Sequence, residues 1–398
     1  MSTSRHERPA CEGGTAVRTD RLSLFSSAIT DEGIAAVERV LRSGWLATGP
    51  LVAEFEAAFA EVVGVEHAVA VTSGTAALEL ALEGLGVGEG DEVITTPLTF
   101  VATAHAIINR GATPVLADID ADGWTLDPSR LAAATTERTR CVLPVHFAGR
   151  PSDMSRIVGF AQERELSVLG DCAHAIEAQW EGRNLGGWGA VNAYSFHPCK
   201  TLTTGEGGMI ATDDGGLTER VRRLRFHGLV PAEPGSGWLR DVTGPGHKAN
   251  MSDVQAALGL EQLRVLDERY AHRCHLVERY RTGLAGADAF VLPPVSEKGQ
   301  RHAWHLFNVL LNPERLRIDR TTLVQAMAAE GIEVAIHYRP LHCLTYLQEL
   351  LGVDEQTCPV ATDVGSRILS LPLHAGMHGE DVDGVVAALR RLVTYYGT

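Results

Sequence analysis

Residues 68–85 read AVAVTSGTAALELALEGL, a short β-branched run followed by a longer amphipathic stretch. The run at 68–71 has the composition of a buried strand, and residues 75–85 place apolar side chains at helical spacing. Similar runs recur along the chain and alternate with helical patterns; the runs cover residues 92–95, 114–118, 141–145, 167–170, 189–196 and 208–212, and the helical patterns cover 100–109 and 153–165. The alternation indicates βαβ units, so the sequence predicts an α/β fold with a mostly parallel sheet covered by helices.

Outside this core the sequence predicts further helices and a division into domains. Two helices flank the loop Ser43–Pro50, and the Pro-, Gly- and Ser-rich stretch 231–246 is typical of a linker. Ser252 is a candidate N-cap for a long helix that reaches about Tyr280. We expect a flexible N-terminus, a large domain and a smaller C-terminal α/β domain, over residues 1–22, 23–245 and 246–398 respectively.

Composition and charge exclude several classes of protein. The 398 residues carry 35 Lys and Arg against 50 Asp and Glu, and the formal net charge of −15 disfavours nucleic acid and anionic membranes as partners. The 45% hydrophobic content argues against collagen-like and disordered chains. Seven scattered cysteines without a CxxC pair indicate neither a disulfide framework nor a zinc site. The scattered cysteines indicate a reduced protein, and no apolar run reaches the roughly 18 residues that a membrane helix needs. We therefore expect a cytoplasmic protein without a membrane segment.

Two apparent metal motifs fail on closer reading. Residues 118–123 resemble the start of an EF-hand loop, but the acidic ligand required at the end of that loop is replaced by Ser129. His302 and His305 have HxxH spacing, which in isolation is more often packing or surface than a pair of metal ligands. No metal site is predicted.

Thr72-Ser73-Gly74-Thr75 lies where the strand at 68–71 ends and a helix begins. Free amides at a helix N-terminus form an anion site, and Gly74 would let a ligand approach the backbone while Thr75 adds a hydroxyl. The turn is therefore a candidate phosphate site. The alternative is that Ser73 or Thr75 merely caps the helix.

Asp171 and His174 follow the strand at 167–170, at the sheet edge where open α/β sheets bind ligands. A nearly buried carboxylate there needs a cationic partner or several donors, and a protonated ring nitrogen would suffice. His174 could hydrogen-bond an oxygen of the same ligand. The alternative for His174 is a core histidine whose hydrogen bonds are satisfied within the protein.

Lys200 follows the strand at 189–196 and precedes the glycine-rich turn Thr203–Gly208. Desolvation in such a place lowers the pKa of a lysine and frees its amine for Schiff-base chemistry. The alternative is a surface lysine at a strand end. A phosphate site, an acid for a pyridinium nitrogen and an imine-forming lysine together are what pyridoxal phosphate (PLP) requires.

The motifs carry a resemblance to a known family. The chain contains TSGTAAL at 72–78, TFVAT at 99–103, DCAHA at 171–175, SFHPCKTLTTGEGGM at 195–209 and NMSDVQAALG at 250–259. It resembles the DegT/DnrJ/EryC1/StrS aminotransferases, from about Leu24 to its end. The resemblance implies a fold-type I PLP-dependent aminotransferase acting on a nucleotide-linked keto sugar.

The same resemblance implies roles for individual residues. Lys200 would form the imine with PLP and move a proton, and Asp171 would keep the pyridine nitrogen protonated. Asn250 resembles a residue that reaches the phosphate of the neighbouring subunit, which implies a homodimer with shared active sites. This chain departs from the family pattern here, because many members carry Asn and Arg where it has Lys248 and Asn250. The full set of implied cofactor residues is Ser73, Gly74, Thr75, Phe100, Asp171, His174, Ser195, Lys200 and Asn250.

The implied reaction moves the amino group of L-glutamate onto a keto sugar and releases 2-oxoglutarate. The loop at 43–50 resembles those of sugar 4-aminotransferases, so we expect dTDP-4-keto-6-deoxyglucose, aminated at C4 for a glycosylated metabolite such as an antibiotic. A 3-keto or UDP sugar, a PLP-dependent sugar dehydratase and a non-catalytic regulator of this fold are the alternatives. Candidate substrate-binding residues are Trp45, Tyr338 and His342.

Overall fold

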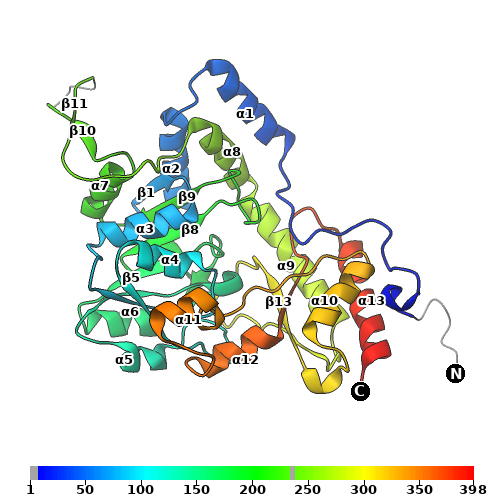
Figure 1. Ribbon diagram of the computed structural model, residues 1–398. Coiled ribbons are helices and arrows are strands. Elements are labelled where there is room, and N and C mark those ends of the chain that lie inside the picture. Colours follow the sequence, from blue (N-terminus) through cyan, green and yellow to red (C-terminus); the bar gives the residue numbers. More distant parts are fainter. Residues whose placement is uncertain (1–7, 234–237) are drawn as a thin grey trace.

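The computed structural model describes residues 8–233 and 238–398 and has one large sheet covered by helices on both faces (Figure 1). The sheet order is β1-β9-β8-β5-β4-β2-β3, and β9 runs antiparallel to its neighbours β1 and β8. The remaining neighbours pair in parallel. The strands are β1 (His67–Val71), β2 (Glu92–Thr95), β3 (Thr113–Leu116), β4 (Thr139–Leu143), β5 (Ser167–Asp171), β8 (Val191–Ser195) and β9 (Gly208–Thr212).

The predicted α/β class and the mostly parallel sheet are confirmed, because every strand expected between residues 68 and 212 is present. Alternate residues of β1 face opposite layers: Ala68 and Ala70 belong to one hydrophobic core, and Val69 and Val71 belong to the other. The helices around this sheet are α2 (Pro50–Val63), α3 (Gly74–Gly84), α4 (Ala102–Asn109), α5 (Leu131–Ala134), α6 (Met154–Gln162) and α7 (Gly215–Leu224).

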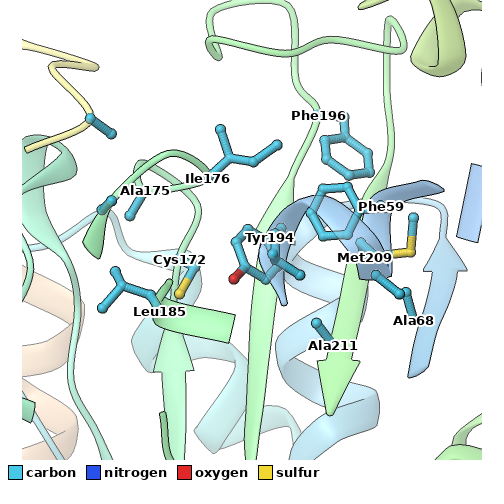
Figure 2. Packing of buried hydrophobic residues seen from close by; sticks show 14 of the residues in the cluster. Phe59, Ala68, Cys172, Ala175, Ile176, Leu185, Tyr194, Phe196, Met209 and Ala211 are labelled. Carbon is cyan, nitrogen blue, oxygen red and sulfur yellow. The ribbon is translucent and has the colours of Figure 1, made fainter. Parts of the chain in front are cut away.

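One core is built on aromatic rings from α2 and from β8. Phe59 packs edge-on against Tyr194 and Phe196, with ring centroids 5.0 and 5.4 Å apart. Figure 2 shows these three rings together, with Met209 of β9 beside them. Aromatic pairs in this geometry add about 0.5–1.5 kcal/mol beyond the burial of their area. The packing fixes the end of β8, from which the chain continues into the segment that contains Lys200.

A smaller antiparallel sheet lies toward the C-terminus and has the order β12-β13-β14. Its core contains Phe307, Leu369 and Leu389, all fully buried. The predicted smaller C-terminal α/β part is therefore present. Its elements are β12 (Phe290–Val291), β13 (Phe307–Leu311), α10 (Arg320–Ala329), α11 (Thr345–Leu351), α12 (Pro359–Arg367), β14 (Ile368–Leu371) and α13 (Gly379–Tyr396).

The predicted linker at 231–246 is wrong. On either side of residues 234–237, which lie outside the described residues, β10 (Leu229–Pro231) pairs with β11 (Arg240–Val242), and the chain after β11 returns to the large sheet (Figure 1). The Thr72 amide donates to the Ala249 carbonyl at 2.9 Å on that return. Proline and glycine mark a break in regular structure, but they do not say whether the chain leaves a domain or folds back onto it.

The expected long helix after Ser252 is two helices, α8 (Asp253–Arg264) and α9 (Leu266–Gly283), which meet at Val265. Ser252 is confirmed as the N-cap and forms a capping box with Gln255. α8 packs on α2 and on α1 (Asp31–Ser43), whereas later residues of α9 join the C-terminal core. We therefore propose a division of the two domains within α9 rather than at residue 245.

The N-terminal segment is attached to the C-terminal part. The Val17 amide donates to Glu330 at 2.8 Å, Arg18 pairs with Asp381 at 2.7 Å, and Leu22 bridges to Ile332. These contacts argue against flexibility in the part of the predicted 1–22 segment that the structure describes. Residues 1–7 lie outside the described residues.

Candidate active site

A cavity of about 460 Å³ opens at the carboxyl ends of the parallel strands. The segments after β1, β5 and β8 meet there because these strands run in the same direction and end at the same edge of the sheet. Nine of the residues predicted for the site line this cavity, from five separate parts of the chain: Ser73, Gly74, Thr75, Phe100, Asp171, His174, Ser195, Lys200 and Tyr338.

The turn between β1 and α3 forms one end of the cavity. The Ser73 hydroxyl accepts a hydrogen bond from the Ala76 amide at 3.1 Å, so Ser73 is an N-cap, as the alternative interpretation expected. Gly74 and Thr75 line the cavity at the first turn of α3, where backbone amides lack partners within the helix. The same turn can therefore be capped by Ser73 and still offer amides to an anion.

Gly74 is required at this turn because β8 ends directly against it. A Cβ atom at Gly74 would lie 2.7 Å from the Cβ of Ser195. Gly208 has a similar constraint, since its Cβ would lie 2.3 Å from the Ser73 carbonyl oxygen. The two glycines let the ends of β1, β8 and β9 approach closely enough to form one small cradle.

A Gly74→Ala substitution is expected to weaken PLP binding at least tenfold, which corresponds to about 1.4 kcal/mol, because the added methyl group displaces Ser195 from the cradle. The measurement is titration of the apoenzyme with PLP, followed by visible absorbance. Gly159→Ala is the matched control, because nothing lies within 4 Å of its added Cβ in α6. Wild-type affinity in Gly74→Ala would contradict the assignment of this turn.

Asp171 is the last residue of β5 and is 5% exposed. Its carboxylate accepts hydrogen bonds from the Thr103 hydroxyl at 2.8 Å and from the Ala173 amide at 3.1 Å. Burial raises the pKa of Asp171, while these two donors and the charge of Lys200 lower it. The carboxylate therefore has two donors from the protein and can accept a further hydrogen bond on the cavity side.

Lys200 lies in the turn that follows β8 and lines the same cavity as the β1–α3 turn. Burial lowers the pKa of its ammonium group, and the nearby Cys199 and Asp171 partly oppose that shift. A lysine with a lowered pKa has more neutral amine at physiological pH, which is the nucleophilic form. The alternative interpretation, a surface lysine, does not describe this side chain.

His174 is buried beside Asp171, and its position fixes its tautomer. Its Nδ1 accepts from the Ala148 amide at 3.3 Å, so Nε2 carries the proton in the neutral ring. Nε2 lies 3.4 Å from the Tyr338 hydroxyl, in the cavity wall. Burial and the charge of Lys200 lower the pKa of His174 well below its usual value. The ring is therefore a neutral donor toward the cavity.

Three predicted residues do not line the cavity. The Asn250 Nδ2 donates to the Thr48 hydroxyl at 2.5 Å, and its Oδ1 accepts from Lys248. Trp45 is 61% exposed and covers Gly49. His342 is fully buried and pairs with the Thr362 hydroxyl at 2.7 Å. The geometry of the single chain thus gives His342 a packing role.

A family model for the DegT/DnrJ/EryC1/StrS aminotransferase family matches residues 27–390. This chain belongs to that family. A relative from Bacillus subtilis, the spore coat polysaccharide biosynthesis protein SpsC, is 44% identical to this family member over 371 residues, which are 92% of this chain and 95% of the relative.

Solved structures share the architecture of this DegT/DnrJ/EryC1/StrS family member. Spr1654 from Streptococcus pneumoniae, assigned as a sugar aminotransferase and solved in its PMP form, superposes with a TM-score of 0.89 at 30% identity and covers 94% of this chain and 98% of its own. DesI, solved in the presence of its TDP-sugar product, has a TM-score of 0.88 at 32% identity. The match covers 98% of this chain and 97% of the DesI chain. The chain is a PLP-dependent sugar aminotransferase.

The site of this aminotransferase fits PLP on its own geometry. The close approach of Ser195 leaves no space for a side chain at position 74, and the Asp171 carboxylate can accept a further hydrogen bond. Lys200 lines the same cavity. When bound, PLP supplies an electron sink that stabilises negative charge on the carbon next to the amine. In the described residues, no cluster of three or more His, Cys, Asp or Glu could hold a metal.

Several cavity residues of this aminotransferase were missed by the sequence analysis. Thr103 holds the Asp171 carboxylate, and Phe25, His197, Glu206 and His337 also line the cavity. The signal for Thr103 was present in the TFVAT motif at 99–103, and its hydroxyl lies 2.8 Å from that of Thr99. Phe25 and His337 lie far from the motifs in sequence and gave no signal. Within 8–233 and 238–398, no helix is long and apolar enough to span a membrane.

Buried neutral histidines predict acid sensitivity. Burial lowers the pKa of His146 to about 3 and that of His337 to about 4, against about 6.5 in an unfolded chain. The neutral form of these two histidines contributes fully to the free energy of unfolding above about pH 6.5. As the pH falls from about 6.5 toward the folded pKa values, the unfolded chain binds protons at these rings and the folded chain does not, so the contribution is lost. Each such histidine should lower the free energy of unfolding by about 1.4 kcal/mol per pH unit between pH 6 and 4.5, as measured by urea unfolding. An unchanged slope in His146→Gln would contradict this.

Proposed function

We propose that this aminotransferase transfers the amino group of L-glutamate to C4 of dTDP-4-keto-6-deoxyglucose. The observation that carries the proposal is that Lys200, Asp171 and the β1–α3 turn line a single cavity. The structure of DesI, solved in the presence of its TDP-sugar product, supports a thymidine nucleotide as the carrier. The name of SpsC supports a product that is used in glycan assembly.

In this proposal Lys200 is the catalytic base and nucleophile. Its lowered pKa supplies the neutral amine, and its place in the cavity lets it move a proton between the donor carbon and the cofactor. Asp171 keeps the ring nitrogen protonated, because a buried carboxylate with two donors stabilises a cation beside it. Lys200 also favours transamination over dehydration, since sugar dehydratase relatives place His at this position.

The other cavity residues hold and orient the cofactor in this proposal. His174 would donate from Nε2 to the phenolic oxygen of the cofactor, and the exposed ring of Phe100 would stack on the cofactor ring. Gly74, Thr75 and Ser195 bind its phosphate, with Ser73 holding the turn in shape. Tyr338 contacts the substrate, since its ring lies 5.8 Å from Phe100 and its hydroxyl lies beside His174.

We also propose a homodimer in which Asn250 reaches the phosphate site of the neighbouring subunit. Support comes from the position of Asn250 outside its own cavity, beside Val71 at the end of β1. Exposed apolar residues of α1 and of the loop after it, Ile34, Leu41 and Trp45, are consistent with a covered surface. In that arrangement Trp45 could also border the neighbouring sugar site.

The test is to incubate the holoenzyme with L-glutamate and dTDP-4-keto-6-deoxyglucose and to identify the products by mass spectrometry and NMR. We expect one 2-oxoglutarate for each 4-amino sugar. Product from a 3-keto or UDP sugar alone would move the assignment to that alternative. Dehydrated sugar without 2-oxoglutarate would indicate a dehydratase, and no turnover of any keto sugar would favour a regulator.

A further inference from the structure

A buried ion pair lies outside the set of residues that line the cavity. Arg273 of α9 donates from Nη2 to the Glu177 carboxylate, and both side chains are 2% exposed. The same Nη2 also donates to the Ala303 carbonyl at 3.3 Å. Glu177 follows the Asp171–His174 segment, so the pair joins that segment to α9 and to the loop before β13.

The pair is connected to the turn that carries Lys200. The Thr201 hydroxyl donates to the other oxygen of Glu177, Oε2, at 3.3 Å. Thr201 is the residue after Lys200, so its side chain restrains the backbone on the C-terminal side of the lysine. On the other side, the Lys200 amide donates to the His197 carbonyl at 2.9 Å. The turn is thus held at both sides of the lysine.

A buried ion pair is weak evidence for stability, because the cost of desolvating two charges offsets their attraction. The Glu177–Arg273 pair therefore needs an explanation other than a contribution to the free energy of unfolding. Glu177 uses one oxygen for Arg273 and the other for Thr201, so the carboxylate fixes the distance between α9 and the Lys200 turn. Neither side chain lines the cavity, which leaves them no direct contact with a ligand there.

We propose that Glu177 and Arg273 are positioning residues that hold Lys200 in place through Thr201. The catalytic residue remains Lys200, and this inference rests on the role proposed for it above. A flexible lysine would lose the near-attack geometry that the cavity otherwise supplies, so its reaction with PLP and with the amino donor would slow. The effect should appear in PLP affinity and in kcat, with little change in the KM of the sugar.

Thr201→Val tests the connection with little risk to folding, because it keeps the side-chain shape and removes only the hydroxyl. We expect the Kd of PLP, measured by visible absorbance, to rise threefold to tenfold and the rate of colour loss with L-glutamate to fall similarly. Thr201→Ser keeps the hydroxyl, so its Kd for PLP and its rate of colour loss should match the wild-type values. Thr218→Val is the matched control: its hydroxyl donates to the Asp214 carbonyl at 2.9 Å in α7, away from the cavity.

The ion pair itself is tested with the double variant Glu177→Leu/Arg273→Met, since replacing both members of a buried pair is often neutral for stability. A wild-type melting temperature with weaker PLP binding supports positioning. A lower melting temperature with unchanged PLP affinity would assign the pair a purely structural role, and unchanged values for both Thr201→Val and the double variant would overturn the proposal. PLP affinity does not depend on the sugar, so the inference can fail separately from the proposed function.

Discussion

Lys200→Ala is expected to lower kcat for transamination by at least about 10⁴-fold, the largest effect of any single substitution in this chain. The variant loses both the nucleophile and the group that moves the proton, and among the described residues Lys200 is the single lysine that lines the cavity. Burial lowers the pKa of Lys200, which raises the fraction of its side chain that is present as the neutral, nucleophilic amine. The measurement is single-turnover kinetics with L-glutamate, followed by visible absorbance.

The control for this substitution is Lys298→Ala. Lys298 lies in an exposed loop before β13 and does not line the cavity, so its removal should leave kcat unchanged. The free energy of unfolding of apo Lys200→Ala should equal or exceed the wild-type value, because the substitution removes an amine whose charged form is disfavoured by burial. Retention of more than about one-hundredth of the wild-type kcat would assign the chemistry to another residue.

Asp171→Asn is expected to lower kcat by about 10²- to 10³-fold, because removal of one preorganised electrostatic group from a buried site typically costs that much. The amide has nearly the shape of the carboxylate, but it cannot balance the charge of a protonated ring nitrogen. The measurement is kcat for the L-glutamate half-reaction, with PLP binding followed in parallel. PLP affinity should fall far less than kcat, since the phosphate cradle remains.

Thr103→Val gives a graded version of the same test. The Thr103 hydroxyl lowers the pKa of Asp171, so its loss should raise that pKa and move the acid limb of the kcat profile to higher pH. Asp118→Asn is the control, because this buried carboxylate accepts from the Val360 and Ala361 amides at 2.9 and 3.0 Å and should affect stability alone. An unshifted profile in Thr103→Val together with full activity in Asp171→Asn would exclude Asp171 from the mechanism.

Much of the site was predictable because the carboxyl ends of parallel strands meet at one edge. Once strands were assigned at 68–71, 167–170 and 189–196, the residues that follow each of them could be placed together without coordinates. Ser73 was predicted among the cofactor residues, with a helix cap as the alternative, and the structure shows its hydroxyl capping α3. The sequence could not show that the chain after β11 returns to the large sheet, since turn residues mark a change of direction but not its destination.

The structure places the predicted substrate residues outside the motifs differently from one another. His342 lies only four residues from Tyr338, yet the structure buries it against Thr362 while Tyr338 lines the cavity. Side-chain direction in irregular segments depends on local backbone angles, which composition does not determine. Phe25 reaches the cavity from before α1 and gave no signal, because its contact spans most of the chain.

The sequence alone determined the fold class, the strand ends and the identity of the reactive groups, because hydrophobic periodicity and residue chemistry are local properties. Tertiary structure decided which of those groups share a cavity, how burial shifts their pKa values, and which distant residues support them. Glu177, Arg273 and Thr201 illustrate the difference: the three are far apart in the chain, and only the packing of α9 against the segments after β5 and β8 brings them into contact. Long-range contacts of this kind depend on the whole fold, so no local pattern could have shown them.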